Sequence, residues 1–127
     1  MLTKIRQLDY VIVLCDDLPR MKAYYRELFD FRVAVETPTV LALEAGSITL
    51  CLRKRTRGYD GKSAGPASPG VQLAFRVPPG HVDECLLELQ RQGVTILDPP
   101  TDQTWGHRTL YFADPEGNVL EVYEELA

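Results

Sequence analysis

The chain has 127 residues, of which 45% are hydrophobic and 25% charged, and its formal net charge is −4. This balance is typical of one globular domain with a sizeable core, and the acidic charge argues against a nucleic-acid partner. The sequence has no apolar run long enough to span a membrane and no signal-peptide core, so we expect a cytoplasmic protein without membrane contact. The wide spacing of Cys15, Cys51 and Cys85 favours buried reduced thiols over disulfides or a zinc site.

The first part of the chain is typical of one helix and four strands. An aspartate N-cap precedes the apolar periodicity of the helix, and Asp30 stands where a left-handed C-terminal residue is expected. Gly46 lies in the turn between the third and fourth strands. We expect a strand over 9–14, a helix over 18–29, and strands over 32–36, 39–44 and 47–52.

A long connection is expected over residues 53–70. It begins with the basic run 53–57 and continues with Gly, Ser, Ala and Pro, a composition that is typical of a mobile loop. The basic run indicates either a solvated surface or a site for an anionic ligand, and the solvated surface is the favoured interpretation.

The order of elements then repeats. Tyr10 aligns with Gln72 and Gly46 with Gly117, and the second alignment places Leu50 opposite Glu121. We therefore expect an α+β fold, a single domain over 1–127, with two β-α-β-β-β modules over about 5–52 and 71–126. The second module is predicted to contain a strand over 71–77, a helix over 81–92, and strands over 94–97, 109–113 and 119–124.

Residues 114–118, with the sequence Asp-Pro-Glu-Gly-Asn, are typical of a turn between two strands. Beyond it, Glu121 is a lone carboxylate inside an otherwise apolar strand. It either points to solvent from a half-buried strand or lies buried with partners, because an ionised carboxylate without partners is costly to bury. Both interpretations stay open from the pattern alone.

This layout, together with the stretches 8–13, 24–31 and 105–121, resembles the vicinal oxygen chelate superfamily. That superfamily includes glyoxalase I, extradiol dioxygenases and the bleomycin resistance proteins. The resemblance covers essentially the whole chain. It implies curved mixed sheets around an open cleft and a homodimer.

The resemblance also implies where metal ligands would lie. The four positions used by metal-binding members fall on Tyr10, Leu50, Gln72 and Glu121. Glu121 matches the family pattern and Gln72 is a weaker precedented ligand, whereas Tyr10 departs from the pattern and Leu50 cannot coordinate a metal. We therefore expect no metal or other cofactor; if a divalent metal binds, its ligands are Gln72 and Glu121.

The run 105–115 resembles the bleomycin resistance branch, in which a Trp-Gly loop leads into the strand before the Asp-Pro turn. Trp105 is interpreted as a flat ligand contact or as a cap on the core. His107 is a candidate proton carrier, and Arg108 is expected to pair with an anionic ligand or with Glu121. The predicted ligand-binding residues are Tyr10, Leu50, Gln72, Trp105, His107, Arg108 and Glu121.

Two functions remain open. The first is a metal-free protein that holds a small, partly aromatic or cationic molecule, such as an antibiotic or a metabolite, in the cleft of a homodimer. The second is a lyase, isomerase or dioxygenase that uses a weak metal site or metal-free acid–base chemistry. Its candidate catalytic residues are Glu121, His107 and Tyr10.

Overall fold

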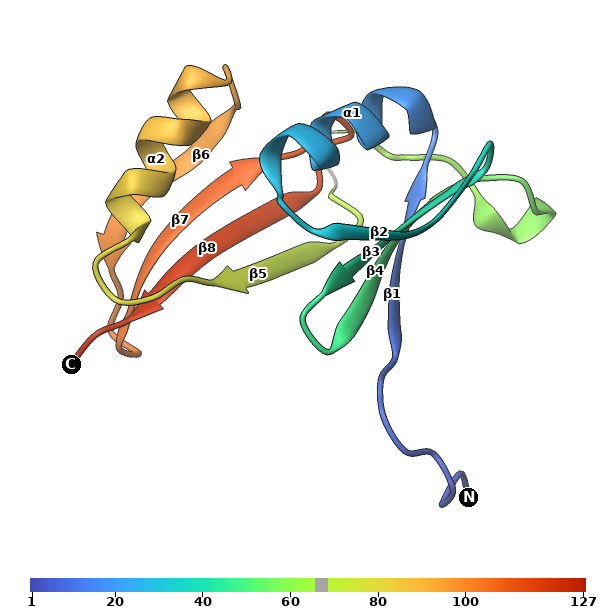
Figure 1. Cartoon of the computed structure of the whole chain (residues 1–127), viewed down its shortest axis with the longest axis horizontal. Coiled ribbons are helices and arrows are strands. Elements are labelled where there is room, and N and C mark those ends of the chain that lie inside the picture. The colour runs from blue at the N-terminus through green and yellow to red at the C-terminus, as the bar shows by residue number, and fades with distance from the viewer. Residues whose placement is uncertain (66–68) are drawn as a thin grey trace. The chain divides into compact units, whose positions relative to one another are not determined.

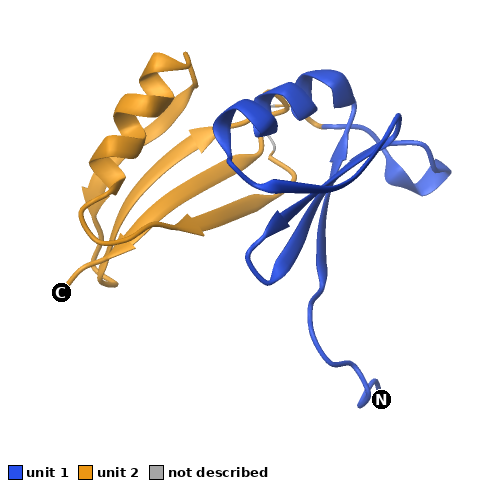
Figure 2. Ribbon diagram, in the orientation of Figure 1, with its two compact units in different colours: residues 1–63 blue, residues 64–127 orange. Residues whose placement is uncertain are grey.

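A computed structural model describes residues 1–65 and 69–127 of the chain. They form two compact units, unit one over residues 1–63 and unit two over residues 64–127 (Figure 2). Each unit combines one α-helix with one four-stranded mixed sheet. The predicted α+β class with two β-α-β-β-β modules is therefore confirmed.

The sheet of unit one has the strand order β1-β4-β3-β2, in which β1 and β4 are parallel and the other pairs are antiparallel. Its helix α1 packs on β4 (Figure 1). The elements are β1 (Tyr10–Cys15), α1 (Leu18–Leu28), β2 (Arg32–Thr37), β3 (Val40–Ala45), β4 (Ile48–Lys54) and a 3-10 turn, η1 (Gly58–Asp60).

Helix α1 begins at a cap that the sequence predicts. The Asp17 carboxylate accepts a hydrogen bond from the backbone N–H of Arg20 at 3.2 Å, which satisfies one of the free donors of the first turn. The end of the helix differs from the prediction. Phe29 is extended while its N–H still donates to the Tyr25 carbonyl, and no described non-glycine residue has a positive φ. The predicted left-handed Asp30 is therefore wrong.

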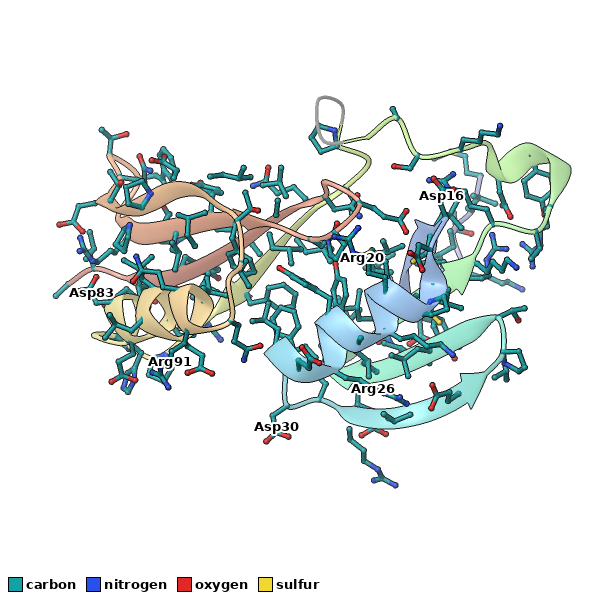
Figure 3. All side chains as sticks on the ribbon, turned by 90° about the horizontal axis from the view of Figure 1, so that it is seen from above. Asp16, Arg20, Arg26, Asp30, Asp83 and Arg91 are labelled. Carbon is teal, nitrogen blue, oxygen red and sulfur yellow. The ribbon has the colours of Figure 1, made fainter. Side chains whose placement is uncertain are left out.

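Unit two repeats this arrangement with the strand order β5-β8-β7-β6, and β5 is parallel to β8. Helix α2 lies over β6, β7 and β8 (Figure 1), and Asp83 and Arg91 mark its first and last turns (Figure 3). Within the described residues, neither helix is long and apolar enough to cross a bilayer. The elements are β5 (Gln72–Arg76), α2 (Val82–Arg91), β6 (Ile96–Asp102), β7 (His107–Ala113) and β8 (Val119–Glu125).

Strand β6 is longer than predicted, because it continues through Pro99 and Pro100 to Asp102. Proline cannot donate to a strand ladder, so it is tolerated only at sheet edges and irregularities. Strand β6 is an edge strand, and its register with β7 shifts twice between Ile96 and Thr101. The edge position therefore accommodates the prolines that shortened the prediction.

The residues predicted to begin a loop at position 53 are ordered up to Asp60. Strand β4 continues to Lys54, and the buried Asp60 carboxylate accepts from both terminal nitrogens of Arg53 at 2.9 and 3.1 Å. It also accepts from the backbone N–H groups of Thr56 and Arg57, each at 2.9 Å. The basic run is thus folded around an internal carboxylate, and the connection begins at residue 55, two residues later than predicted. Residues 66–68 of that loop lie outside the described part of the chain.

Each sheet has one face toward its helix and one face away from it. In unit two the helix side carries the buried side chains of Leu110, Phe112, Leu120 and Val122. Because side chains alternate along a strand, the residues between them lie on the opposite side, which we call the open face. The open face of unit two carries Gln72, Tyr111 and Glu121, and the corresponding face of unit one carries Tyr10, Ile12 and Cys51.

Candidate functional site

The open face of unit two holds a buried carboxylate at its centre. Glu121 lies on β8, an inner strand, with Ala74 of β5 and Tyr111 of β7 as its register partners. Only 8% of its surface is exposed, and the Gln72 side-chain amide donates to its Oε1 at 3.2 Å. Of the two interpretations that the pattern left open, the structure therefore supports the buried carboxylate with partners.

Tyr111 lies beside Glu121 and was not among the residues predicted from the sequence. Burial raises the pKa of its phenol, and the neighbouring Glu121 carboxylate raises that pKa further, through its charge and a hydrogen bond with the phenol. The Thr109 hydroxyl acts in the opposite direction, because its hydrogen bond lowers the Tyr111 pKa. The alternation of side chains along 107–113 was the available signal, since it puts residues 107, 109, 111 and 113 on one face.

Polar side chains continue this row across the sheet. Thr109 is fully buried, and its Oγ1 accepts a hydrogen bond from the Gln103 side-chain amide at 2.9 Å. The row therefore runs from Gln103 through Thr109 and Tyr111 to Glu121, with Gln72 on the far side of the carboxylate. Buried polar groups are stable only when they are hydrogen-bonded, and this row satisfies its members in turn.

Aromatic side chains lie at one end of the same face. The rings of His107 and Tyr123 are stacked, with centroids 4.4 Å apart and an interplanar angle of 23°. Trp105 lies in the turn between β6 and β7 and is 59% exposed, so it is not a cap on the core. Gly106 supports this turn with a φ of +89°, a backbone conformation that residues other than glycine rarely adopt.

Arg108 lies on the other side of the sheet from Glu121. Its register partner is Glu124, on the helix side of β8, and its guanidinium pairs with Asp83 of α2 and Asp102 of β6, each at 2.9 Å. These two carboxylates raise the pKa of the guanidinium. The expected pairing of Arg108 with Glu121 is therefore wrong, because strand alternation turns the two side chains to opposite faces.

Leu50 also does not lie at the predicted site. It is 3% exposed and faces the helix side, as does its register partner Val11. The glycine alignment failed because the hairpin at Gly46 contains two residues between the paired strands, whereas the hairpin at Gly117 contains five. A slip of one residue moves a side chain to the other face of a sheet.

Strand register identifies Cys51 as the true counterpart of Glu121. Cys51 pairs with Ile12 two residues beyond Tyr10, as Glu121 pairs with Ala74 two residues beyond Gln72. Burial raises the pKa of the Cys51 thiol, so it stays protonated at neutral pH. Tyr10 is 55% exposed on the same face.

These residues do not fit the metal site that the resemblance implies. Gln72 and Glu121 are one oxygen-bearing pair, but Tyr10 and Cys51 offer a phenol and a protonated thiol in place of imidazole or carboxylate. Among the residues described, no group of three or more His, Cys, Asp or Glu side chains could hold a metal ion.

Two buried carboxylates fix the strand that carries Glu121. The Asp114 carboxylate accepts from the backbone N–H groups of Glu116 and Asn118 at 2.9 and 3.0 Å, which forms the predicted turn before β8. Glu124 accepts from the backbone N–H groups of Gly80 and Val82 and so caps α2 from the helix side of β8. The turn was predicted, but the cap was not, because its partners lie more than 40 residues apart.

Comparisons with known proteins agree with this architecture. The model of the Glyoxalase/Bleomycin resistance protein/Dioxygenase superfamily matches residues 7–122 of the chain. The uncharacterised protein YwkD of Bacillus subtilis is 28% identical over 139 residues, covering 95% of this chain and 98% of its own. A virulence protein of Salmonella typhimurium is 21% identical over 121 residues, covering 93% of this chain and 83% of its own.

A solved structure from Nocardioides, a glyoxalase/bleomycin resistance protein/dioxygenase, superposes with a TM-score of 0.82 at 21% identity. The superposition covers 97% of this chain and 85% of the Nocardioides chain. Because the family match extends over nearly the whole sequence, the chain belongs to the Glyoxalase/Bleomycin resistance protein/Dioxygenase superfamily.

Proposed function

We propose that this protein binds a small organic molecule on the open face of unit two without using a metal. The observation that carries the proposal is the buried Glu121 carboxylate, which is held by the neutral donors Gln72 and Tyr111. Burying an ionised group costs free energy, and a structural role for it would be met more cheaply by an apolar side chain. We infer that Glu121 is present to recognise a ligand.

The neighbouring side chains supply the rest of a binding surface. A carboxylate has about four acceptor positions, so Glu121 keeps acceptor capacity beyond its two partners. The stacked His107 and Tyr123 rings and the exposed Trp105 offer flat apolar area, which aromatic side chains present at low entropic cost. This combination supports the bleomycin-resistance type of function, in which a ligand is held without chemical change. A homodimer is part of the proposal.

Trp105 provides a direct test because it is the only tryptophan in the chain. A panel of antibiotics and metabolites is screened by Trp105 fluorescence and by thermal shift. We expect at least one compound to bind. We expect Glu121→Gln to lower the affinity for that compound by about tenfold or more, since hydrogen bonds to charged groups contribute about 1.5–3 kcal/mol.

Glu88→Gln is the matched control. Glu88 lies on α2 and pairs with Arg91 at the surface, so removal of its charge leaves the open face unchanged. The proposal fails if no compound changes either the fluorescence or the thermal midpoint. It also fails if Glu121→Gln and Glu88→Gln lower the affinity for the ligand equally. Light scattering measures the expected homodimer on the same samples.

A second function is supported by the hydrogen-bonded pair of Tyr111 and Glu121. A carboxylate and a phenol in contact are suited to moving a proton, and His107 lies on the same strand face. Under this alternative the protein is a lyase or isomerase of the same superfamily. Compounds found in the screen are then followed for turnover by NMR. Catalysis is supported only if Glu121→Gln retains the fold and loses turnover.

Metal dependence is measured separately, by elemental analysis of untagged protein purified without chelator. Titration with Zn(II), Ni(II), Mn(II) and Fe(II) follows. We expect no near-stoichiometric metal. A bound metal that is lost in Glu121→Ala would replace the metal-free proposal with a metal-dependent enzyme.

A further inference from the structure

We propose that the ligand presents an organic cation, such as an ammonium, amidinium or guanidinium group, to Glu121. This inference rests on the proposed function and specifies its ligand class. It follows from the direction of the hydrogen bonds around Glu121 and from the distribution of charge on the open face.

In the row of polar side chains on the open face, each hydrogen bond is donated in the direction of Glu121. The Gln103 amide donates to the Thr109 hydroxyl, which leaves the proton of that hydroxyl free to be donated onward. An ionised carboxylate can only accept, so the phenol of Tyr111 donates its hydrogen bond to Glu121, and the Thr109 hydroxyl, whose hydrogen bond lowers the Tyr111 pKa, donates to the phenol oxygen. Gln72 donates to Glu121 from the opposite side. Glu121 is therefore the acceptor at the end of the row.

The donors that hold Glu121 are neutral. In the described part of the chain, no Lys, Arg or His nitrogen forms an ion pair with it. Arg76, on the same face, lies 3.8 Å from Glu125, and Arg108 is on the helix side with two carboxylates. Asp98 adds further negative charge near Tyr111. A ligand that brings a positive charge would supply the counter-charge that Glu121 lacks.

An organic cation fits this face better than a divalent metal ion. Gln72, Tyr111 and Glu121 offer one carboxylate and two neutral groups, whereas a catalytic zinc site uses three protein ligands drawn from His, Cys, Asp and Glu. A planar amidinium or guanidinium can instead donate two parallel hydrogen bonds to one carboxylate. Its apolar body would lie against aromatic side chains such as His107 and Tyr123.

The test uses three probes of nearly equal size and shape: benzamidine, which is cationic, benzamide, which is neutral, and benzoate, which is anionic. Binding to the full-length protein is followed at neutral pH by NMR chemical-shift changes and by Trp105 fluorescence. We expect benzamidine to bind at least about tenfold more tightly than benzamide, because its contact with the carboxylate is charge-assisted. Benzoate is expected to bind least.

Three variants connect this preference to Glu121. Glu121→Gln keeps the shape and removes the charge, so the preference for benzamidine over benzamide is expected to disappear. Tyr111→Phe removes a neutral donor and keeps the carboxylate, so the preference is expected to remain. Glu88→Gln, the surface control on α2, is expected to bind like the natural protein.

The inference and the proposed function fail differently. Benzamide or benzoate binding as tightly as benzamidine would overturn the inference and leave a small-molecule site in place. Failure of benzamidine to bind at millimolar concentration would also overturn the inference, while the proposed function would then depend on the broad panel. Stoichiometric binding of Ni(II) or Zn(II) that Glu121→Gln abolishes would overturn it in favour of an inorganic cation.

Discussion

The open faces of the two units differ in chemistry although the units share one architecture. The inner strand of unit two carries Glu121 beside Gln72, whereas the same register positions in unit one carry Cys51 and Tyr10. In both units the inner-strand residue is buried and its neighbour on the first strand is exposed, but in unit two the Gln72 amide donates a hydrogen bond to the Glu121 carboxylate. The helix sides need similar apolar side chains to form each core. The open faces carry no such requirement, so the two copies could diverge there.

The units also use buried aspartates differently at the ends of their inner strands. Asp60 follows β4 and binds the Arg53 guanidinium together with two backbone N–H groups. Asp114 precedes β8 and binds backbone N–H groups and the Asn118 side-chain amide. In unit one a cation of the basic run, Arg53, is thus paired with a buried carboxylate. In unit two a carboxylate on the open face is left without an ion-pair partner in the described residues.

The largest expected effect tests the register on which this comparison depends. Leu50→Ala should lower the free energy of unfolding by about 2–5 kcal/mol, because it leaves a cavity on the helix side. Cys51→Ala removes one heavy atom from the open face and should lower it by only about 1 kcal/mol. Urea denaturation of both variants measures the difference. A larger loss from Cys51→Ala would support the alignment that equates Leu50 with Glu121.

The next effect concerns the basic run of unit one. Asp60→Asn should lower the thermal midpoint at neutral pH, because the Arg53 guanidinium and the backbone N–H groups hold the Asp60 pKa well below its usual range. A carboxylate whose pKa is depressed by folding contributes stability above its unfolded pKa of about 4, and this contribution is lost as the pH falls below that value.

The difference between Asp60→Asn and the natural protein should therefore be constant from about pH 5 to pH 8 and should shrink in acid. Thermal denaturation from acid, below the unfolded pKa, up to about pH 8 measures this difference. Asp98→Asn, an exposed carboxylate in unit two, is the matched control and should show a much smaller difference. A difference that persisted unchanged in acid would show that charge is not what Asp60 contributes.

The smallest expected effect is a change in the pKa of Tyr111, which tests its contact with Glu121 on the open face of unit two. Removing the charge in Glu121→Gln should lower the pKa of Tyr111, although burial keeps it above the ordinary value of about 10. Ultraviolet titration of the tyrosines follows this change, and Tyr111→Phe identifies which of the six tyrosines is responsible. An unchanged titration in Glu121→Gln would contradict the contact between the two side chains.

Much of the fold could be predicted because its signals are local. Apolar periodicity located both helices and all eight strands, and the Asp-Pro-Glu-Gly-Asn sequence located the turn before β8. Strands β4 and β6 were predicted to end before their observed last residues. The reason is that the Arg53–Asp60 pair and the edge position of β6 are properties of the folded chain. The family relationship also followed from the motifs.

Sequence alone therefore determined the order of elements and the two modules, and it singled out Gln72 and Glu121, whose side chains are hydrogen-bonded in the structure. Tertiary structure decided which side chains surround that pair. It placed Tyr111 beside Glu121, Cys51 in the position expected for Leu50, and Arg108 on the opposite face. The physical reason is that side chains alternate along a strand, so the pairing of distant strands and the length of one hairpin decide which face each residue occupies.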